Sequence, residues 1–488
     1  MLLAAALPEP TVVATNFSLV LMAIGLAILI ISIAKYKVHP LVALIVVGVL
    51  NGLAFGIPMI GPVQLPAVGL NAGPVLQGGV IGIITHGFGV TIGNIGIVII
   101  LGYMLGTLLE DTGGALVLAN TILKAVGRKR SALAMGISGY IVSVPVFSDS
   151  AVIIMTPVAR SLSARAGVPL VALAGALNAG IMATHTIVPP TPGPLASAAT
   201  LGADLGMLLL IGLIPAAAYT AAGTWWCTRK FITNKWPEPA DMEGLDSNVD
   251  ENFNITGDKK LPSALWTFAC LLVPILLICA QSFGTIWLND AGVASDAPIR
   301  HFLGFFGNAH VALSIGVVMC FFLDISRFSK EQCAKWFSKA IEGSGFVVLA
   351  TGAAGSYGWI LRASGVGEHL GNLIAQTPLP AVVVPFLVTA LLSVSNGSAT
   401  VSLVTGSAII LPLMGPLGLH PVIASLALSS GASFAYHTNA THYWVVVRAN
   451  KISEQAGFGI VTAGTAIGSV ASLIVVWILA MFIGPDAF

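Results

Sequence analysis

Charged side chains are scarce in this chain. Of its 488 residues, 21 are Lys or Arg and 20 are Asp or Glu, together 8%, whereas soluble domains average about 25%. A soluble protein of this length needs more charge than this to keep its surface hydrated, and a nucleic-acid-binding protein needs a basic surface. The composition therefore argues against a soluble, disordered or nucleic-acid-binding protein.

Motifs for catalysis and for metal binding are missing as well. The sequence has no Gly-X-X-X-X-Gly-Lys-Ser/Thr loop for ATP, no His-Glu-X-X-His motif and no Gly-X-Ser-X-Gly motif. The five cysteines lack the spacing of a metal site. We therefore expect no cofactor, no ATP-driven pumping and no enzymatic activity.

Apolar residues dominate instead. They make up 56% of the chain, and the mean hydropathy is +0.94. The apolar runs are near 20 residues long, which is the length that a membrane-spanning helix needs. We therefore expect an all-α polytopic protein embedded in a lipid bilayer. Runs that fit full spans lie near Ser18–Lys35, Pro40–Phe55, Asn94–Leu109, Pro169–Val188, Met207–Trp226, Ser263–Gln281, Phe302–Phe322, Gly345–Leu361, Pro421–Phe434 and Ile460–Ile483.

Two further apolar runs are interrupted by polar residues. Ala132–Ala159 contains Phe-Ser-Asp-Ser at 147–150, and Ala381–Met414 contains Ser-Asn-Gly-Ser at 395–398. Each run fits either two spans or one re-entrant helical hairpin that returns to its own side of the membrane.

The basic residues favour the hairpins. With the N-terminus outside and both runs folded as hairpins, only Arg300 and Arg362 face outward, and the other 19 of the 21 basic residues face the cytoplasm. Such an excess of cytoplasmic Lys and Arg is typical of inner-membrane proteins. This topology makes the first hairpin enter from the cytoplasm and the second from outside.

The opposite orientation of the hairpins indicates an inverted repeat. Residues 106–113 align with residues 358–365 at a shift of 252 positions (358 minus 106), and a polar-tipped hairpin follows each segment. A span broken by polar residues follows each hairpin, at 185–194 and at 437–442. Two inverted repeats, each with a hairpin and a broken helix, are typical of secondary transporters.

This pattern divides the chain into three parts. Residues 227–262 are the one long hydrophilic segment and are predicted to be a cytoplasmic linker. The linker separates an N-terminal membrane repeat, residues 1–226, from a C-terminal one, residues 263–488.

Asp149, at the tip of the first hairpin, is the main candidate for chemistry. An acid at the membrane centre costs about 2.5–3.5 kcal/mol on insertion scales, so it needs a partner or a water-filled cavity. We interpret Asp149 as a proton carrier or cation ligand. The alternative is a structural acid that caps the next helix together with Ser148 or Ser150.

The tip of the second hairpin carries no acid. Its hydroxyl, amide and backbone groups precede a helix start, and a helix start attracts a carboxylate. We therefore predict a substrate-binding tip, with ordinary helix capping as the alternative. The candidate residues are Ser395, Asn396, Gly397, Ser398 and Thr400.

The two broken spans supply the other candidates. Four prolines between 189 and 194 prevent a regular helix, and irregular backbone in a membrane is tolerated where it lines a cavity. His185 and His437 stand at matching places and join Asp149 as candidates for proton or cation coupling, although a lone histidine can also be a packing residue. The predicted substrate-binding residues are Thr184, His185, Thr186, Thr191 and Gly193 in the first span, and His437, Thr438, Asn439, Thr441 and His442 in the second. Ser148 and Ser150, at the tip of the first hairpin, are predicted to bind substrate as well.

At these motifs the sequence resembles the gluconate permease family of bacterial organic-acid symporters, from about residue 17 to the C-terminus. Residues 102–115, Gly-Tyr-Met-Leu-Gly-Thr-Leu-Leu-Glu-Asp-Thr-Gly-Gly-Ala, are similar to the family's Gly-Leu-Leu-Glu-Asp-Ser-Gly-Gly region. Pro-Val-Phe-Ser-Asp at 145–149 is similar to Pro-Leu-Phe-Phe-Asp, and residues 189–194 to Pro-Pro-His-Pro-Gly-Pro. Residues 397–401 are similar to Gly-Ser-Ala-Thr-Val, and His-Thr-Asn-Ala-Thr-His-Tyr-Trp at 437–444 to His-Val-Asn-Asp-Ser-Gly-Phe-Trp.

The resemblance implies proton-coupled import of sugar acids or small hydroxy or amino carboxylates across a bacterial inner membrane. It also implies kinship with the ion-transporter superfamily, whose members are often homodimers with a scaffold part and a moving, elevator-like part. By match, site roles fall to Asp149, His185, Ser398, Thr400, His437 and Asn439.

The sequence departs from the family pattern at three places. Thr191 stands where the family has a second His, Ala440 where it has Asp, and Asn396 where it has Gln. Because two ionisable groups are lost, Na⁺ coupling with Asp149 as an anionic ligand is an alternative to proton coupling. A passive channel or facilitator for small organic anions is a further alternative.

Overall fold

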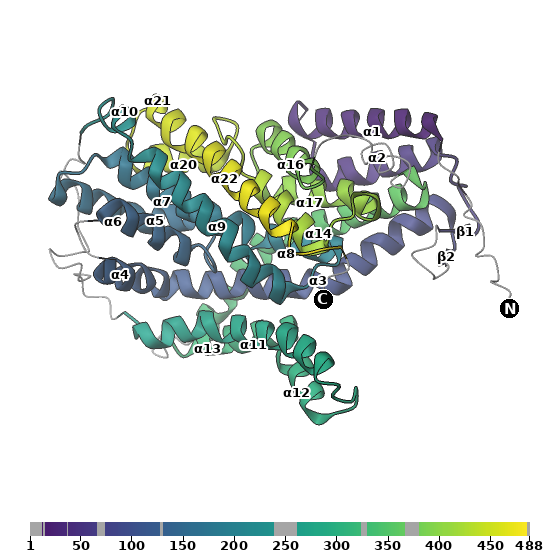
Figure 1. Ribbon diagram of the computed structural model, residues 1–488, viewed down its shortest axis with the longest axis horizontal. Coiled ribbons are helices and arrows are strands. Elements are labelled where there is room, and N and C mark those ends of the chain that lie inside the picture. The colour runs from purple at the N-terminus through teal and green to yellow at the C-terminus, as the bar shows by residue number, and fades with distance from the viewer. Residues whose placement is uncertain are drawn as a thin grey trace.

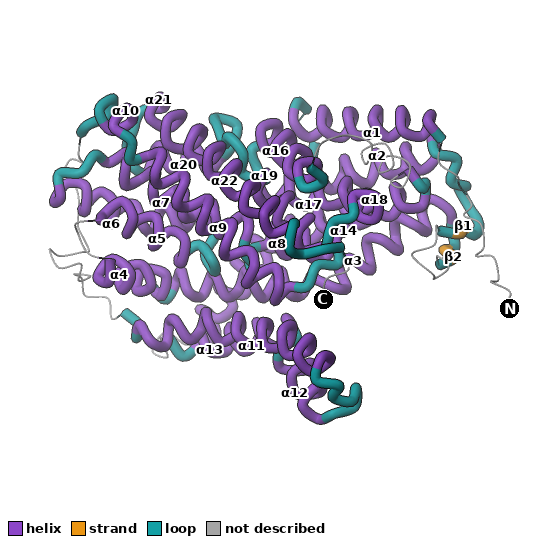
Figure 2. The backbone as a smooth tube through the Cα atoms, in the orientation of Figure 1, coloured by secondary structure: helices purple, strands orange, loops and turns teal. Residues whose placement is uncertain are grey.

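The computed structural model describes residues 12, 15–36, 38–65, 74–126, 130–238, 261–323, 329–366 and 380–485. Helices account for most of these residues (Figure 2). The strands in the described ranges are β1, Val63–Gln64, and β2, Val75–Leu76, which pair antiparallel with Val63 opposite Leu76. The expected all-α class is confirmed.

The helices before residue 239 include two interrupted pairs, α5 with α6 and α7 with α8. They are α1 Asn16–Ala34, α2 Pro40–Ala54, α3 Gly79–Asp111, α4 Gly114–Val126, α5 Ser131–Val142, α6 Ser148–Ala166, α7 Leu170–Ile187, α8 Pro192–Leu201, α9 Leu205–Cys227 and α10 Lys230–Thr233.

The helices after the linker also include interrupted pairs, α16 with α17 and α19 with α20. They are α11 Ala264–Asp290, α12 Pro298–Phe306, α13 Ala309–Phe321, α14 Lys330–Ala363, α16 Val383–Asn396, α17 Ala399–Ile410, a 3-10 turn η3 Leu411–Leu413, α18 Met414–Leu417, α19 Pro421–Gly431, α20 Thr441–Ala449, α21 Glu454–Gly457, a π turn η4 Phe458–Thr462 and α22 Ala463–Ala480.

Many of the described helices are long enough to span a membrane. Within the described ranges, eight helical stretches are long and apolar enough to cross a membrane, or nine if α12 and α13 are counted as one span. The expected straight span Phe302–Phe322 is in fact this pair, bent by 57°. Asn308 caps the start of α13 by accepting the His310 N–H at 3.0 Å, which explains why a new helix begins there. The polytopic membrane class is confirmed.

The two longest helices, α3 and α14, pack side by side along the middle of the molecule (Figure 1). Small residues permit this contact, because a Cβ added to Gly355 of α14 would collide with the Thr91 hydroxyl of α3. Stripes of small residues let membrane helices approach closely. Both helices are longer than predicted, since α3 begins at Gly79 and α14 at Lys330.

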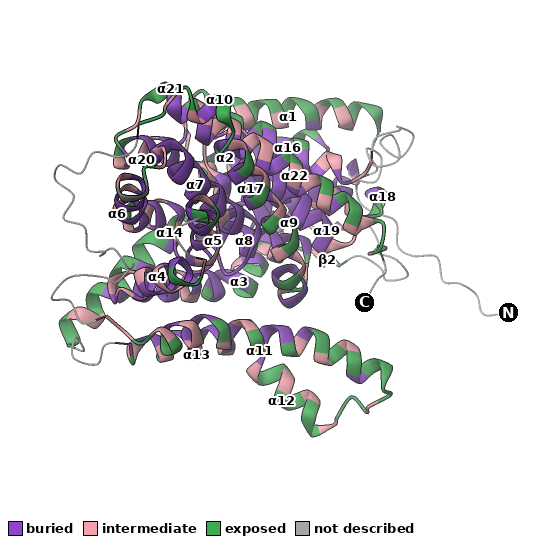
Figure 3. Cartoon of the chain, turned by 60° about the vertical axis from the view of Figure 1, so that its left-hand side comes forward, coloured by how far each residue is buried: buried purple, intermediate pink, exposed green. Residues whose placement is uncertain are grey.

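The other helices gather on both sides of this central pair. α2 packs on α14, and α1 packs on α2. Helices α11, α12 and α13 form a separate layer that contacts the other helices through α3, α4 and α9 (Figure 1). The largest buried cluster joins α4–α7 and α9 with α17, α19, α20 and α22. In Figure 3 α7, α8 and α19 are buried almost throughout, whereas α1 and α12 are largely exposed.

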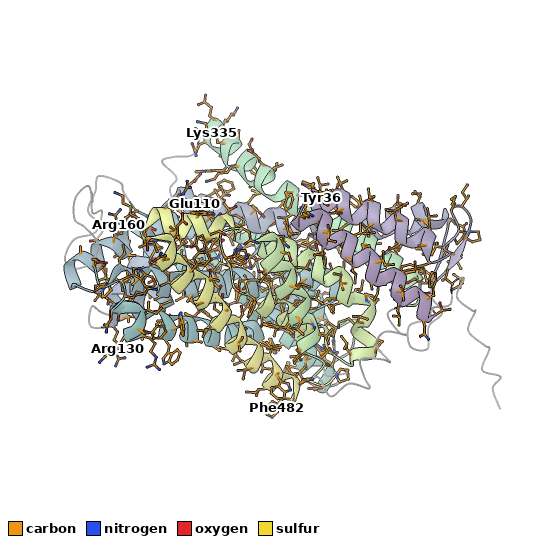
Figure 4. The ribbon with its side chains drawn as sticks, turned by 90° about the horizontal axis from the view of Figure 1, so that it is seen from above. Tyr36, Glu110, Arg130, Arg160, Lys335 and Phe482 are labelled. Atoms are coloured by element: carbon orange, nitrogen blue, oxygen red, sulfur yellow. The ribbon has the colours of Figure 1, made fainter. Side chains whose placement is uncertain are left out.

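Several charged side chains lie at the periphery of the molecule. Figure 4 shows Lys335 near the end of a helix that projects beyond the rest of the molecule, and Arg130 and Arg160 at the outer edge. Lys339 of α14 bonds Asp111 of α3 at 3.0 Å and lies 3.6 Å from Glu110. Most of the predicted linker, residues 239–260, lies outside the described ranges.

Candidate functional site

Asp149 lies in the first turn of α6, directly after the break between α5 and α6. This break packs tightly against α3. The Phe147 ring stacks on Tyr103 with 4.1 Å between ring centroids, and a Cβ added to Gly106 would collide with the Pro145 carbonyl oxygen. The start of α6 is therefore held at a fixed place near the C-terminal end of α3.

Asp149 pairs with His442, which comes from the other half of the chain. The distance between Asp149 Oδ1 and His442 Nδ1 is 2.8 Å. The Asp149 side chain is 44% exposed, whereas the His442 side chain is 5% exposed. The carboxylate is therefore partly accessible, while the imidazole behind it is enclosed by protein.

α7 presents two polar side chains to this pair. The Asn178 Oδ1 lies 2.8 Å from His442 Nε2. His185 is seven residues further on, which is two helical turns and the same face of the helix, and it interacts electrostatically with His442 and Asp149. Its Nδ1 is buried and has no hydrogen-bond partner among the described residues. Two histidines and one acid thus share one small region.

The tip of the second helix pair is a capped turn between α16 and α17. Gly397 takes the left-handed conformation, φ 70°, that glycine adopts without steric cost. Ser398 accepts the Val401 N–H at 3.4 Å, and Asn396 accepts the Ser398 N–H at 2.7 Å and donates to Ser402 at 3.2 Å. The capping interpretation of Ser398 and Asn396 is thus observed directly.

Tyr436 links this tip to the Asp149–His442 pair. It is 3% exposed, and its hydroxyl interacts with the backbone of Ala399, the first residue of α17. Its ring lies 6.4 Å from that of His442, centroid to centroid. Tyr436 therefore connects the start of α17 to the start of α20, where His442 in turn contacts Asp149 at the start of α6.

The start of α8 packs on the start of α17. The backbone before α8 is irregular, with a cis peptide bond between Pro189 and Pro190, and the Thr191 hydroxyl donates to the Val188 carbonyl at 2.7 Å. A Cβ added to Gly193 would lie 2.7 Å from the Leu403 side chain and 3.6 Å from Thr400 Cα. Glycine at 193 thus lets the two helix starts touch.

The loop between α19 and α20 closes over the second tip. His437 Nε2 lies 3.2 Å from the Val394 carbonyl oxygen, and the Asn439 amide donates to the same oxygen at 2.7 Å. A Cβ added to Gly397 would lie 2.6 Å from the Asn439 carbonyl oxygen. His437 therefore lies at the turn between α16 and α17, and the histidine that contacts Asp149 is His442.

The other predicted residues fall into two groups. The hydroxyls of Thr184, Thr186 and Ser395 donate to carbonyls of their own helices, those of Gly180, Met182 and Leu391, at 2.7–3.4 Å. Ser148 is 8% exposed, Ser150 and Thr400 are half-buried, and Thr438 and Thr441 are exposed.

Four helix starts, those of α6, α8, α17 and α20, are therefore gathered together with Asp149, His442 and Tyr436. Each helix start carries a partial positive charge from its free N–H groups. The arrangement can attract an anion without a Lys or Arg side chain, and it keeps an exposed carboxylate beside the same place.

Two members of this cluster, Asn178 and Tyr436, were not predicted. Asn178 is the one amide in the apolar run Leu170–Met182, and its spacing of seven residues from His185 was a usable signal. Tyr436 directly precedes the predicted His437. His442 was predicted as a substrate residue, and its pairing with Asp149 had no signal in the sequence.

A family model described as GntP family permease matches residues 17–482. The chain belongs to the GntP permease family. Such proteins are permeases, and the expectation that this chain is not an enzyme is thereby confirmed.

Curated relatives match over most of their length. A permease of Haemophilus influenzae is 31% identical, and the match covers 88% of this chain and 85% of the relative. A gluconate permease of Pseudomonas aeruginosa is 28% identical with 93% and 95% covered. The inner membrane permease YgbN of Escherichia coli is 31% identical with 93% and 96% covered. With the apolar spans, these relatives make this chain a multi-pass inner-membrane protein.

Two solved structures share the fold. MtrF of Neisseria gonorrhoeae, described with a class of antimetabolite efflux pumps, has a TM-score of 0.62 at 14% identity and covers 97% of this chain and 100% of its own. The YdaH transporter of Alcanivorax borkumensis, described as having an unusual topology, has a TM-score of 0.58 at 14% identity and covers 91% and 99%. At this identity the likeness concerns the fold alone.

Proposed function

We propose that this GntP family permease is a proton-coupled symporter that imports a small organic anion, such as a sugar acid or a related hydroxy carboxylate. One observation carries the proposal: four helix starts meet beside an exposed carboxylate that is paired with a buried histidine. The gluconate permease of Pseudomonas aeruginosa, similar along nearly the whole chain, supports the substrate class.

The anion is held by partial charges and hydroxyl groups. A helix start is equivalent to roughly half a positive charge, so the starts of α8 and α17 offer a site for one carboxylate. Ser398, Thr400 and the backbone around Gly193 lie at these starts and supply hydrogen-bond donors. A polyhydroxy chain has further partners in the exposed hydroxyls of Thr438 and Thr441.

Asp149 couples the anion to a proton. Two negative charges about 6 Å apart in a medium of dielectric constant about 20 repel by roughly 3 kcal/mol, which is more than a hundredfold in affinity. A proton on the Asp149–His442 pair removes this repulsion, so anion and proton bind better together than apart. Departure of the anion toward the cytoplasm then favours release of the proton on the same side.

The architecture we propose consists of two inverted repeats, residues 1–226 and 263–488, joined by a cytoplasmic linker at 227–262. The order of elements supports it. A long helix, an interrupted helix pair and a broken span follow one another as α3, α5–α6 and α7–α8, and again as α14, α16–α17 and α19–α20. In this proposal α5–α6 and α16–α17 are re-entrant hairpins that enter from opposite sides, and the N-terminus lies outside.

The transport movement we propose is elevator-like. The large buried cluster of α4–α7, α9, α17, α19, α20 and α22 would move as one body against a scaffold around α3 and α14, in a homodimer. The separation of these helices into distinct buried clusters supports such a division.

The decisive experiment uses Asp149→Asn in proteoliposomes. Full-length protein is reconstituted, and gluconate accumulation is measured under an imposed proton gradient, an imposed Na⁺ gradient and no gradient. We expect Asp149→Asn to retain saturable gluconate binding and exchange but to lose proton-driven accumulation. Asp290→Asn, at the exposed end of α11, is the matched control and should behave as wild type.

Each alternative gives its own result. Accumulation that follows the Na⁺ gradient would replace proton coupling by Na⁺ coupling, with Asp149 as a cation ligand. Equilibration without accumulation in the wild-type protein would identify a passive facilitator. Unchanged proton-driven accumulation by Asp149→Asn would refute the coupling role of this residue.

A further inference from the structure

We propose that Asn178 is a positioning residue for His442, whose side-chain amide serves both protonation states of the imidazole, so that Asp149, His442 and Asn178 work as one proton-carrying unit. The proposal rests on the proposed function, because it concerns the proton that Asp149 couples to transport. It adds a third member, on α7, to a pair that α6 and α20 provide.

The geometry of the imidazole is fully specified by its two neighbours. Both ring nitrogens lie 2.8 Å from an oxygen, Nδ1 from Asp149 and Nε2 from Asn178. Asn178 is 1% exposed, and its Nδ2 has no hydrogen-bond partner within the described ranges. The amide is therefore buried against the ring, and its second group is not tied to another residue.

The proton count explains why an amide suits this place. When both ring nitrogens carry protons, the Asp149 carboxylate and the Asn178 carbonyl accept one hydrogen bond each. When the imidazole is neutral, Nδ1–H still donates to Asp149, and bare Nε2 needs a donor. Rotation of the Asn178 amide by 180° supplies its NH₂ group, and it breaks no other hydrogen bond seen among the described residues.

Other side chains in this place would favour one state. A carboxylate at position 178 accepts from the imidazolium but has nothing to donate to the neutral ring, so it would hold the proton on His442. An alanine offers nothing to Nε2, and a buried cation without an acceptor is disfavoured. Asparagine offers an acceptor to the imidazolium and a donor to the neutral ring, so it suits both protonation states of His442.

Among the described residues, the titratable groups around His442 are not seen to bond its Nε2, which Asn178 contacts. Asp149 approaches from α6 and His185 from α7, and Tyr436 lies in the loop before α20, with 6.4 Å between ring centroids. α21 contributes Glu454, whose backbone carbonyl accepts the Tyr443 hydroxyl at 2.7 Å. η4 brings no charged residue, and Arg448 at the far end of α20 lies over the Trp444 ring.

The test compares uptake as a function of pH in Asn178→Ala, Asn178→Asp and a matched control. Asn450 is also a buried asparagine with an unpartnered amide atom among the described residues, but its amide bonds the Val446 carbonyl of its own helix at 3.0 Å. Initial rates of gluconate uptake by full-length protein in proteoliposomes are measured from pH 5 to pH 8.5. Asn450→Ala should keep the wild-type midpoint.

The two variants should shift in opposite directions. For Asn178→Ala we expect the midpoint of the pH–uptake curve to fall by at least half a pH unit, which corresponds to about threefold weaker affinity for the proton. The wild-type rate should be regained at lower pH. For Asn178→Asp we expect the midpoint to rise by a similar amount. General damage to the fold lowers the rate at every pH and does not produce opposite shifts.

Two results overturn the proposal, and neither is confused with failure of the proposed function. The first result is that both Asn178 variants keep the uptake midpoint of Asn450→Ala, or that both shift it in the same direction. Asn178 would then have no positioning role, while loss of accumulation in Asp149→Asn would still support the coupling role of Asp149. Proton-driven accumulation by Asp149→Asn would instead refute the coupling role itself, whatever the Asn178 variants do. Should Asn178→Ala fail to fold, the upward shift of Asn178→Asp still decides.

Discussion

Replacing His442 by alanine tests which histidine belongs to Asp149. The substitution removes two hydrogen bonds of 2.8 Å and leaves Asp149 and buried Asn178 without this partner. A buried polar group that loses its partner costs about 1–3 kcal/mol, and the 44% exposure of Asp149 lets water replace part of its loss. We expect the free energy of unfolding in detergent to fall by about 2–3 kcal/mol.

His437→Ala is the natural comparison, because sequence analysis singled out this histidine for coupling. Its ring makes a 3.2 Å contact with the Val394 carbonyl, which Asn439 also bonds at 2.7 Å, so that oxygen keeps a donor after the substitution. We expect a loss of at most about 1 kcal/mol. Proton-driven gluconate accumulation should survive in His437→Ala and disappear in His442→Ala.

Both quantities come from one set of preparations. Unfolding in mixed detergent gives the stability difference, and proteoliposomes made from the same protein give accumulation under a proton gradient. If His437→Ala abolished accumulation and His442→Ala kept it, the coupling role would belong to His437, and the assignment of His442 from its contact with Asp149 would be wrong.

Two further substitutions probe other contacts. Gly397→Ala forces a side chain into the left-handed conformation, which costs about 1–2 kcal/mol, and places its Cβ against the Asn439 carbonyl. Uptake and thermal stability should both fall. Wild-type values for both would show that the turn between α16 and α17 is not packed on the loop before α20. Lys339→Ala removes a half-exposed ion pair with Asp111 and Glu110, so its effect on stability should be below about 1 kcal/mol and shrink in high salt, and a larger, salt-independent loss would contradict a surface contribution.

Much of the fold was predictable because long apolar runs in a sequence indicate membrane helices. The expected runs Pro40–Phe55 and Pro169–Val188 correspond closely to α2 and α7, and the polar interruptions at 147–150 and 395–398 lie where new helices begin. The lengths were predicted less well. α3 starts 15 residues before the predicted Asn94 (94 minus 79), because glycines and a histidine that weaken the hydropathy signal are still compatible with a helix packed against α14.

The candidate site was predictable residue by residue but not contact by contact. Asp149 stands out in sequence because an acid in an apolar hairpin is costly. The partner of Asp149 does not stand out in the sequence, because His437 and His442 lie within six residues of each other. Spacing alone favours His437, which matches His185. Side-chain direction at an irregular turn decides between them, and no periodicity encodes that direction.

The pairing of Asp149 with His442 also constrains how the protein is made. The two residues are 293 positions apart, so at a synthesis rate of about 5–20 residues per second the acid waits roughly 15–60 s for its partner to leave the ribosome. During that interval α6 carries an acid whose insertion costs about 2.5–3.5 kcal/mol. The α5–α6 pair is therefore expected to stay at the membrane surface, or to enter with Asp149 protonated, until the last helices arrive.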